Sequence, residues 1–139
     1  MKLFTINLLK FSIVALLLTV AFRFVLSFSL EKGSPLPVIV TAVLYAVGMF
    51  TSGWIFGKKD YIELPLFDIG FRFHLMTYLI CNGIGELYFL AGLQSSYEKV
   101  SSVHTTAWIW GLFFLIYFII YVISRTKSIL GIDKYDIFD

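Results

Sequence analysis

The chain has 139 residues, of which 59% are hydrophobic, 19% aromatic and only 14% charged, and its formal net charge is +2. A soluble domain of this length needs many more charged residues on its surface, so the composition excludes an ordinary soluble protein and predicts an integral membrane protein. Basic residues are few and spread along the chain, which gives no basis for nucleic-acid binding.

Four apolar stretches are each long enough to cross a hydrocarbon core of about 30 Å as a helix, which takes about 20 residues. In chain order they cover approximately residues 11–30, 36–56, 70–91 and 105–124. The gaps are too short for a separate soluble domain. We therefore predict an all-α integral membrane protein, with four transmembrane helices in one compact bundle over residues 1–139 and a short cytoplasmic tail, residues 125–139.

The first stretch also resembles a cleavable signal peptide, because the basic Lys2 precedes an apolar run. A cleavage region requires small, neutral residues, whereas Phe22, Arg23 and Phe24 stand at that place. We therefore favour an uncleaved span for residues 11–30.

Basic residues beside the spans indicate how the chain is oriented, because Lys and Arg are retained on the cytoplasmic side of a membrane. Eight lie before the first span, between the second and third, or after the fourth: Lys2, Lys10, Lys58, Lys59, Arg72, Arg125, Lys127 and Lys134. Only Lys32 and Lys99 lie in the other two connections. With Arg23 set aside as intramembrane, this distribution predicts that both termini face the cytoplasm. We expect the membrane itself to be a bacterial inner membrane.

Arg23 and Glu86 place full charges at membrane depth, where a charge costs about 2.5 to 3.5 kcal/mol and requires a partner or a functional role. Arg23 lies seven residues before Leu30, and Glu86 lies five residues before Ala91. At 1.5 Å per residue, the two charges lie at similar depths from the same side. Spans one and three run parallel in this topology, so we predict an ion pair between Arg23 and Glu86.

The third span carries a stripe of polar residues at intervals of four, which places them along one helix face: His74, Tyr78, Asn82 and Glu86. One interpretation is a proton or ion path, because His and Glu chains relay protons in transporters. The other is interhelical hydrogen bonding that fixes the bundle. We favour hydrogen bonding, because Tyr78 and Asn82 are not proton carriers at physiological pH.

Tyr45 and two glycines add to the region around the predicted ion pair. Tyr45 of the second span lies near the depth of the predicted pair. The expected intramembrane polar cluster is therefore Arg23, Glu86, Asn82, Tyr78, His74 and Tyr45. Gly83 and Gly85 lack side chains and permit a neighbouring helix to approach closely.

Patterns typical of catalytic or metal sites are missing from the sequence. The single cysteine, Cys81, excludes an internal disulfide and a multi-cysteine metal site. His74 and His104 are predicted near opposite faces of the membrane, and the sequence contains no phosphate loop, nucleophile elbow or zinc signature. We expect a non-enzymatic protein with no catalytic residue, cofactor or metal ion.

Residues 71–82 read Phe-Arg-Phe-His-Leu-Met-Thr-Tyr-Leu-Ile-Cys-Asn, and residues 108–111 read Trp-Ile-Trp-Gly. This pattern resembles the bacterial two-transmembrane (2TM) domain, a helical hairpin with His, Tyr and Asn four residues apart in its first helix. The resemblance covers residues 70–125 and implies a membrane hairpin, an anchor or sensor element without established activity. The chain departs from the pattern in Glu86, in its long outer connection and in lacking a second histidine late in the fourth span.

These features together predict an accessory or interaction subunit that contacts the lipid bilayer and binds a membrane-protein partner or a second copy of itself. The cytoplasmic loop 58–69 and the tail 128–139 are the expected contact segments, because both mix apolar or aromatic residues with charged ones. For the tail, packing on the bundle is favoured over docking to a partner. The alternative function is a small oligomeric transporter or pore that uses Glu86 and the polar stripe.

Overall fold

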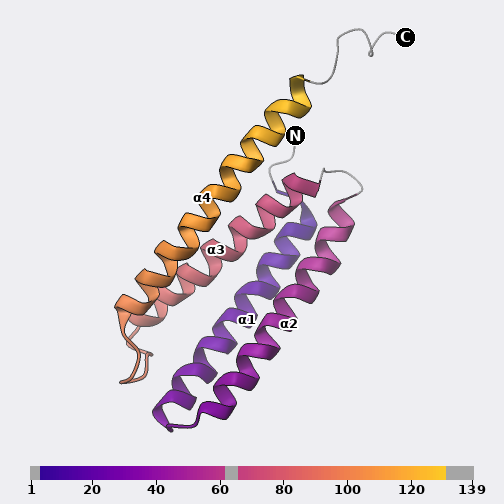
Figure 1. Cartoon of the computed structure of the whole chain (residues 1–139). Coiled ribbons are helices and arrows are strands. Elements are labelled where there is room, and N and C mark those ends of the chain that lie inside the picture. Colours follow the sequence, from indigo (N-terminus) through magenta and orange to yellow (C-terminus); the bar gives the residue numbers. More distant parts are fainter. Residues whose placement is uncertain (1–3, 62–65, 131–139) are drawn as a thin grey trace, which may run out of the picture.

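A computed structural model describes residues 4–61 and 66–130 of the chain (Figure 1). These residues form four helices and no strand: α1 (Ile6–Glu31), α2 (Pro35–Asp60), α3 (Leu66–Leu90) and α4 (Val100–Leu130). The predicted all-helical class is confirmed. Each helix begins before the predicted span and all but α3 end beyond it, because polar residues at the ends continue the helical turns.

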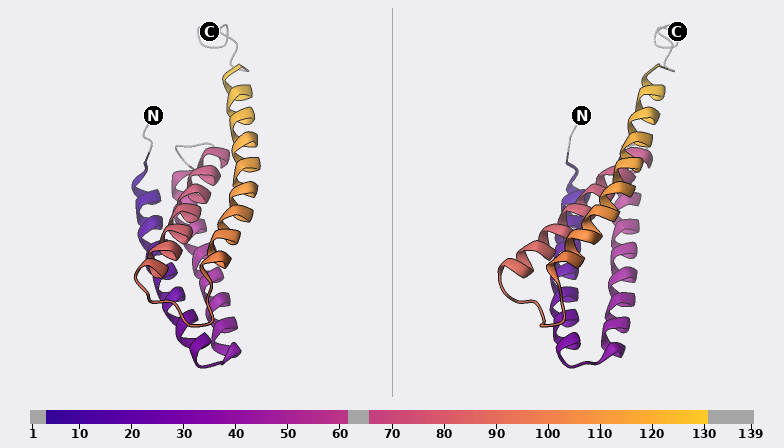
Figure 2. Two further views of the ribbon diagram at one scale, coloured as in Figure 1. Left: turned by 90° about the vertical axis from the view of Figure 1, so that its left-hand side faces the viewer. Right: turned by 60° about the vertical axis from the view of Figure 1, so that its left-hand side comes forward.

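Neighbouring helices run antiparallel, so that α1 begins and α4 ends at the same end of the molecule (Figures 1 and 2). The helix α1 packs extensively against α2 and α3, whereas α4 packs against α3 alone among the described helices. In space the order is therefore α2, α1, α3, α4. The bundle is more open than the predicted compact one, because α4 does not pack against α2 or α1.

Local signals explain where the helices begin and end. The Thr5 side chain caps α1 by accepting a hydrogen bond from the Leu8 N–H, and Pro35 occupies the first turn of α2. Between these helices, Gly33 adopts a positive φ of 63°, a conformation that suits glycine. Gly92 does the same after α3, with a φ of 68°. Short turns of this kind keep consecutive helices adjacent.

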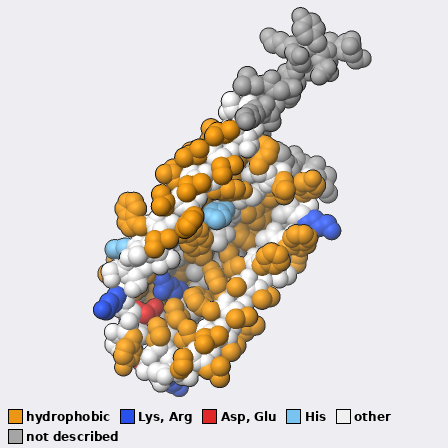
Figure 3. Space-filling model, in the orientation of Figure 1, with side chains coloured by type: hydrophobic (Ala, Val, Ile, Leu, Met, Phe, Trp, Pro, Cys, Tyr) orange, Lys and Arg blue, Asp and Glu red, His pale blue; other side chains and the backbone are white. Residues whose placement is uncertain are grey.

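The small core lies between α1 and α3 and consists of Leu8, Phe11, Ala15, Ile69 and Phe73. The rings of Phe11 and Phe73 lie with their centroids 4.7 Å apart. Most other large apolar side chains are exposed, and Figure 3 shows them covering most of one face. An apolar exterior of this extent fits a lipid environment.

Three helices are long and apolar enough to cross a membrane: Ile6–Glu31, Pro35–Asp60 and the Val100–Ser124 part of α4. Four spans were predicted, and α3 does not reach the same hydropathy. Its apolar residues are interrupted by charged and polar ones, among them Arg72, His74, Asn82 and Glu86. The structure thus supports a membrane protein with three candidate spans.

Two predicted contact segments fall partly outside the described residues. In the loop 58–69, residues 58–60 end α2 and residues 66–69 begin α3, while residues 62–65 are not described. Residues 128–130 end α4, and the rest of the tail, residues 131–139, lies outside the described part of the chain. The predicted packing of the tail stays a prediction.

Two buried carboxylates hold together the end of the molecule where α1 begins, which we call the Asp60 end. Asp60 is 5% exposed and accepts hydrogen bonds from Thr5 Oγ1 and from Asn7 Nδ2, the latter at 2.7 Å. Asp68 is 4% exposed, pairs with Arg72 at 2.6 Å and accepts from the Tyr121 hydroxyl at 2.8 Å. Asp60 therefore ties α2 to the start of α1, and Asp68 ties α3 to α4.

Asp60→Ala is expected to lower the free energy of unfolding by about 2 kcal/mol, because hydrogen bonds to a charged group contribute about 1.5 to 3 kcal/mol. The conservative change Asp60→Asn keeps an acceptor oxygen and should lose less. Unfolding by denaturant in mild micelles, followed by circular dichroism, measures both variants. Equal stability of Asp60→Ala and the unchanged protein would contradict this role for Asp60.

Candidate functional site

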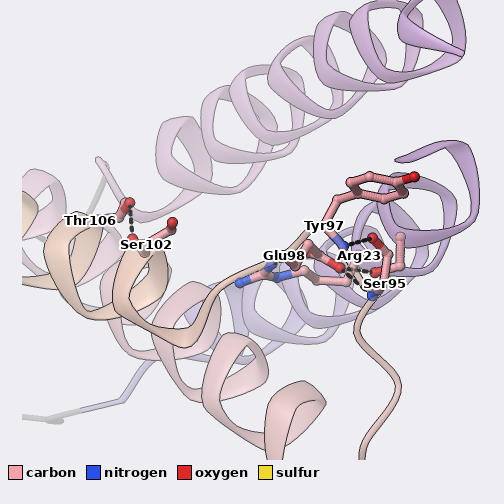
Figure 4. A network of polar contacts seen from close by, with 7 residues as sticks. Arg23, Ser95, Tyr97, Glu98, Ser102 and Thr106 are labelled. Atoms are coloured by element: carbon pink, nitrogen blue, oxygen red, sulfur yellow. Dashed lines mark hydrogen bonds and ion pairs between the residues drawn. The ribbon is translucent and has the colours of Figure 1, made fainter. Parts of the chain in front are cut away.

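The opposite end of the molecule, which we call the Glu98 end, contains a partly buried ion pair between α1 and the connection that follows α3. Arg23 Nη1 lies 3.1 Å from Glu98 Oε1, and the two side chains are 16% and 8% exposed. Ser27 Oγ and the Ser95 N–H both donate to Glu98 Oε2. Figure 4 shows Arg23 and Glu98 pointing toward each other beside Ser95 and Tyr97. The carboxylate thus has three donors around it.

The prediction that Arg23 pairs with Glu86 is wrong. Among the described residues, the acidic partner of Arg23 is Glu98. Glu86 lies 3.0 Å from His104 Nε2, in a contact between α3 and α4 whose side chains are 42% and 54% exposed. The prediction that α1 and α3 meet near Arg23 was correct, since a Cβ on Gly85 would lie 2.9 Å from Arg23 Nη2. Glu86 occupies another face of α3.

Glu98 reaches Arg23 because the connection between α3 and α4, residues 91–99, folds back over the end of α1. A second contact holds this connection in place, since both the Ser96 N–H and the Ser96 hydroxyl donate to the Glu31 carboxylate. The sequence analysis assigned Arg23 an acidic partner within the spans and so missed Glu98 in this connection. The available signal was an acidic residue, Glu98, in a connection long enough to fold back to the intramembrane arginine.

The residues of the polar stripe on α3 have two kinds of hydrogen-bond partner, on α4 and within α3 itself. His74 accepts a hydrogen bond from Trp110 Nε1 at 3.1 Å, and the Tyr78 hydroxyl donates to the Ala107 carbonyl at 3.2 Å, so both residues contact α4. Asn82 donates to the Tyr78 carbonyl within its own helix. The stripe therefore supplies contacts between helices, and it does not form a chain of hydrogen bonds from residue to residue.

Glycines allow α3 and α4 to approach closely at three places, Gly70, Gly85 and Gly111, and a Cβ on Gly70 would meet the Tyr117 hydroxyl. A Cβ on Gly85 would lie 3.1 Å from Val103 Cγ1, and one on Gly111 would lie 3.0 Å from the Tyr78 hydroxyl. Gly83, which was expected to act like Gly85, has no atom within 4 Å of its Cβ position. The prediction of close approach is correct for Gly85 and wrong for Gly83.

Tyr45 belongs to a smaller polar group between α1, α2 and α3. Its hydroxyl lies 3.0 Å from Thr19 Oγ1 and 3.0 Å from Cys81 Sγ. Thr19 in turn donates to the Ala15 carbonyl at 2.7 Å. Tyr45 therefore joins three helices through one hydroxyl, without contacting the ion pair directly.

A cavity of about 520 Å³ connects these groups. Arg23, Glu98 and Lys99 line its polar end, together with Asn82 and Ser102. Apolar and aromatic side chains line most of the rest, including Phe22, Leu26, Tyr45, Met49, Phe89 and Trp110, together with Cys81 and three threonines, Thr19, Thr77 and Thr106. This volume lies in the range of small-molecule sites, about 300 to 1,000 Å³, and the few polar groups at one end would orient a ligand.

The cavity brings together Arg23, Asn82 and Tyr45 from the predicted cluster, and places His74, Tyr78 and Glu86 outside its lining. Among the described residues, no group of three or more His, Cys, Asp or Glu side chains is placed to hold a metal ion. In this cavity Arg23 and Lys99 could bind an anionic group, and the apolar walls could contact an apolar part of the same ligand.

Comparisons with protein-family models, curated proteins and solved structures found no match for this chain. The resemblance of residues 70–125 to the 2TM domain therefore stays a prediction. The helices α3 and α4 do form an antiparallel hairpin, the element that the resemblance implies.

Proposed function

We propose that this chain is a four-span protein of the bacterial inner membrane, with both termini in the cytoplasm, that acts as a non-enzymatic interaction subunit. Three helices have the length and hydropathy of spans. The fourth span is α3, whose polar side chains find partners in the bundle: His74 with Trp110, Tyr78 with the Ala107 carbonyl and Asp68 with Tyr121. Polar groups satisfied in this way are tolerated within a membrane.

The distribution of basic residues supports the orientation. Lys58 and Lys59 lie in the last turn of α2, at the Asp60 end, whereas Lys32 and Lys99 lie at the Glu98 end. Basic residues are retained on the cytoplasmic side, so the Asp60 end faces the cytoplasm.

The observation that carries the interaction role is the position of α4. This helix packs against α3 alone, and only 6% of its most apolar window is buried inside the chain. One stripe points away from α3, with side chains 50% to 65% exposed: Ile109, Phe113, Ile116 and Ile120. We call these residues the outward stripe of α4. Their spacing of three and four residues is that of a helix face that packs against another helix.

The shape of α4 adds to this argument. At 1.5 Å per residue, its 31 residues extend about 46 Å, well beyond a hydrocarbon core of about 30 Å. Figures 1 and 2 show α4 projecting past the other helices at the Asp60 end. A long helix with one intramolecular neighbour is suited to contacting a second membrane protein along its free face.

The transporter alternative has less support from the geometry. Glu86 lies at a half-exposed contact with His104 and does not line the cavity beside Arg23. His74 and Tyr78 both contact α4, so the stripe lacks a continuous lining for an ion. Several copies of the chain would have to supply the remaining walls of such a path.

Site-specific photo-crosslinking in native membranes tests the interaction role. A photoreactive side chain at Ile109 or Ile116 is expected to give a discrete protein adduct, whose partner then co-purifies with the unmodified chain at a fixed ratio. Matched probes at Leu17 of α1 and Val43 of α2, which are 61% and 57% exposed, should give lipid adducts alone. Lipid adducts from all four positions would exclude the outward stripe as an interaction face.

A further inference from the structure

A second hollow of about 1040 Å³ adjoins the cavity beside Arg23 and lies between α2 and α3, with Tyr117 of α4 at its edge. Met49 and Thr77 line both hollows, so the two are adjacent. The second hollow, which we call the apolar groove, is bounded by residues that include Phe11, Phe50, Gly53, Trp54, Ile69 and Phe73. Because α4 does not pack against α2, it does not cover the groove.

The polar end of the cavity beside Arg23 carries an excess of positive charge. Two cations, Arg23 and Lys99, and one anion, Glu98, line it, which gives a formal net charge of 2 − 1 = +1. A guanidinium group has five N–H donors. Glu98 accepts from one Arg23 donor, and the others have no protein acceptor among the described residues. The polar end can therefore bind one further anionic group.

Figure 3 shows basic and acidic atoms side by side among hydrophobic side chains near one end of the molecule. A soluble anion would satisfy the polar end but leave the larger, apolar groove without a ligand. A molecule with an anionic head and a hydrocarbon chain matches both parts. Arginine suits a phosphate head, because its planar group can donate two parallel hydrogen bonds to phosphate oxygens.

We propose that the two hollows together bind one anionic phospholipid, with its phosphate at Arg23 and Lys99 and an acyl chain along the apolar groove. The side of the groove that α4 leaves uncovered gives the lipid access from the bilayer. This inference goes beyond the proposed function and does not rest on it, because no residue of the outward stripe of α4 lines either hollow.

Native mass spectrometry of the full chain tests the proposal. The protein is released from neutral-detergent micelles that contain equal amounts of phosphatidylglycerol and phosphatidylcholine with identical acyl chains. We expect one phosphatidylglycerol to be retained about tenfold more often than phosphatidylcholine, a difference of about 1.4 kcal/mol. Lys99 is exposed, so Lys99→Gln should preserve the fold and lower this preference about threefold.

A second variant tests the groove. A Cβ on Gly53 would lie 3.8 Å from the nearest atom, on the Phe11 ring, so Gly53→Leu places its side chain in the groove without a clash at Cβ. We expect this variant to lose most of the bound lipid. The matched control is Gly83→Leu, at an exposed helical glycine with no atom within 4 Å of its Cβ position and no part in either hollow.

Three results would overturn the proposal. One is equal retention of the two lipids by the unchanged protein, which indicates ordinary contact with bulk lipid. Another is full retention by Gly53→Leu. The third is retention of added palmitate in place of phosphatidylglycerol, which assigns the site to a free fatty acid. If Gly53→Leu does not fold, an unchanged lipid preference in Lys99→Gln overturns the role of the polar end.

Discussion

Replacing Glu98 with alanine is expected to lower the free energy of unfolding by about 3 to 5 kcal/mol, the usual cost of removing one partner from a buried ion pair. Arg23 would remain 16% exposed at membrane depth without its carboxylate partner. Ser27 and the Ser95 N–H would also lose their acceptor. The connection between α3 and α4 would then keep only the Glu31–Ser96 contacts to α1.

A double substitution tests whether the charge left without a partner causes this loss. Arg23→Leu combined with Glu98→Leu should be more stable than Glu98→Ala alone, because no buried charge is left without a partner. Glu86→Gln is the control, since an exposed ion pair contributes only about 0.2 to 1 kcal/mol. Denaturant unfolding in micelles measures all four proteins. A larger loss for Glu86→Gln than for Glu98→Ala would assign the important acidic partner to Glu86.

The amino-acid sequence predicts the helices well, because long apolar stretches are a direct consequence of the thickness of the bilayer. It also places α1 beside α3 near Arg23, since parallel helices bring equal depths together. The third span is the exception. Its polar residues lower its hydropathy, and the partners that satisfy them become visible only when Trp110, Ala107 and Tyr121 of α4 are placed beside α3.

The partner of Arg23 could not be deduced from depth alone. Depth restricts a residue to a layer of the membrane, and Glu86 and Glu98 both satisfy that restriction once residues 91–99 fold back. Which one pairs depends on the direction in which each side chain points. Glu86 faces His104 of α4, so the helix rotation that places Gly85 against Arg23 directs Glu86 elsewhere. The cavity lies among all four helices and the groove between α2 and α3, and no local sequence pattern records how far these helices stand apart.

The attachment of α4 to α3 depends on an aromatic cluster around Phe71. The Phe71 ring lies 4.4 Å from that of Tyr121 and 5.4 Å from that of Phe114, measured between centroids, with Tyr117 and Phe118 within 6.4 Å. Aromatic pairs contribute about 0.5 to 1.5 kcal/mol each beyond the area they bury. Packing of this kind matters in a membrane, where lipid is as apolar as the side chains and the hydrophobic effect does not hold helices together.

Phe71→Ala is therefore expected to loosen α4 selectively, by about 2 kcal/mol or more, while α1 and α2 stay packed. Local opening of α4 would become about 30-fold more frequent. Hydrogen exchange followed by mass spectrometry should show faster exchange in α4 and unchanged rates in α1 and α2. Phe113→Ala is the matched control, because Phe113 is 65% exposed on the outward stripe. If hydrogen exchange became equally faster in all four helices, α4 would open together with the other helices as one cooperative unit. Packing against α3 alone would then not allow α4 to open independently.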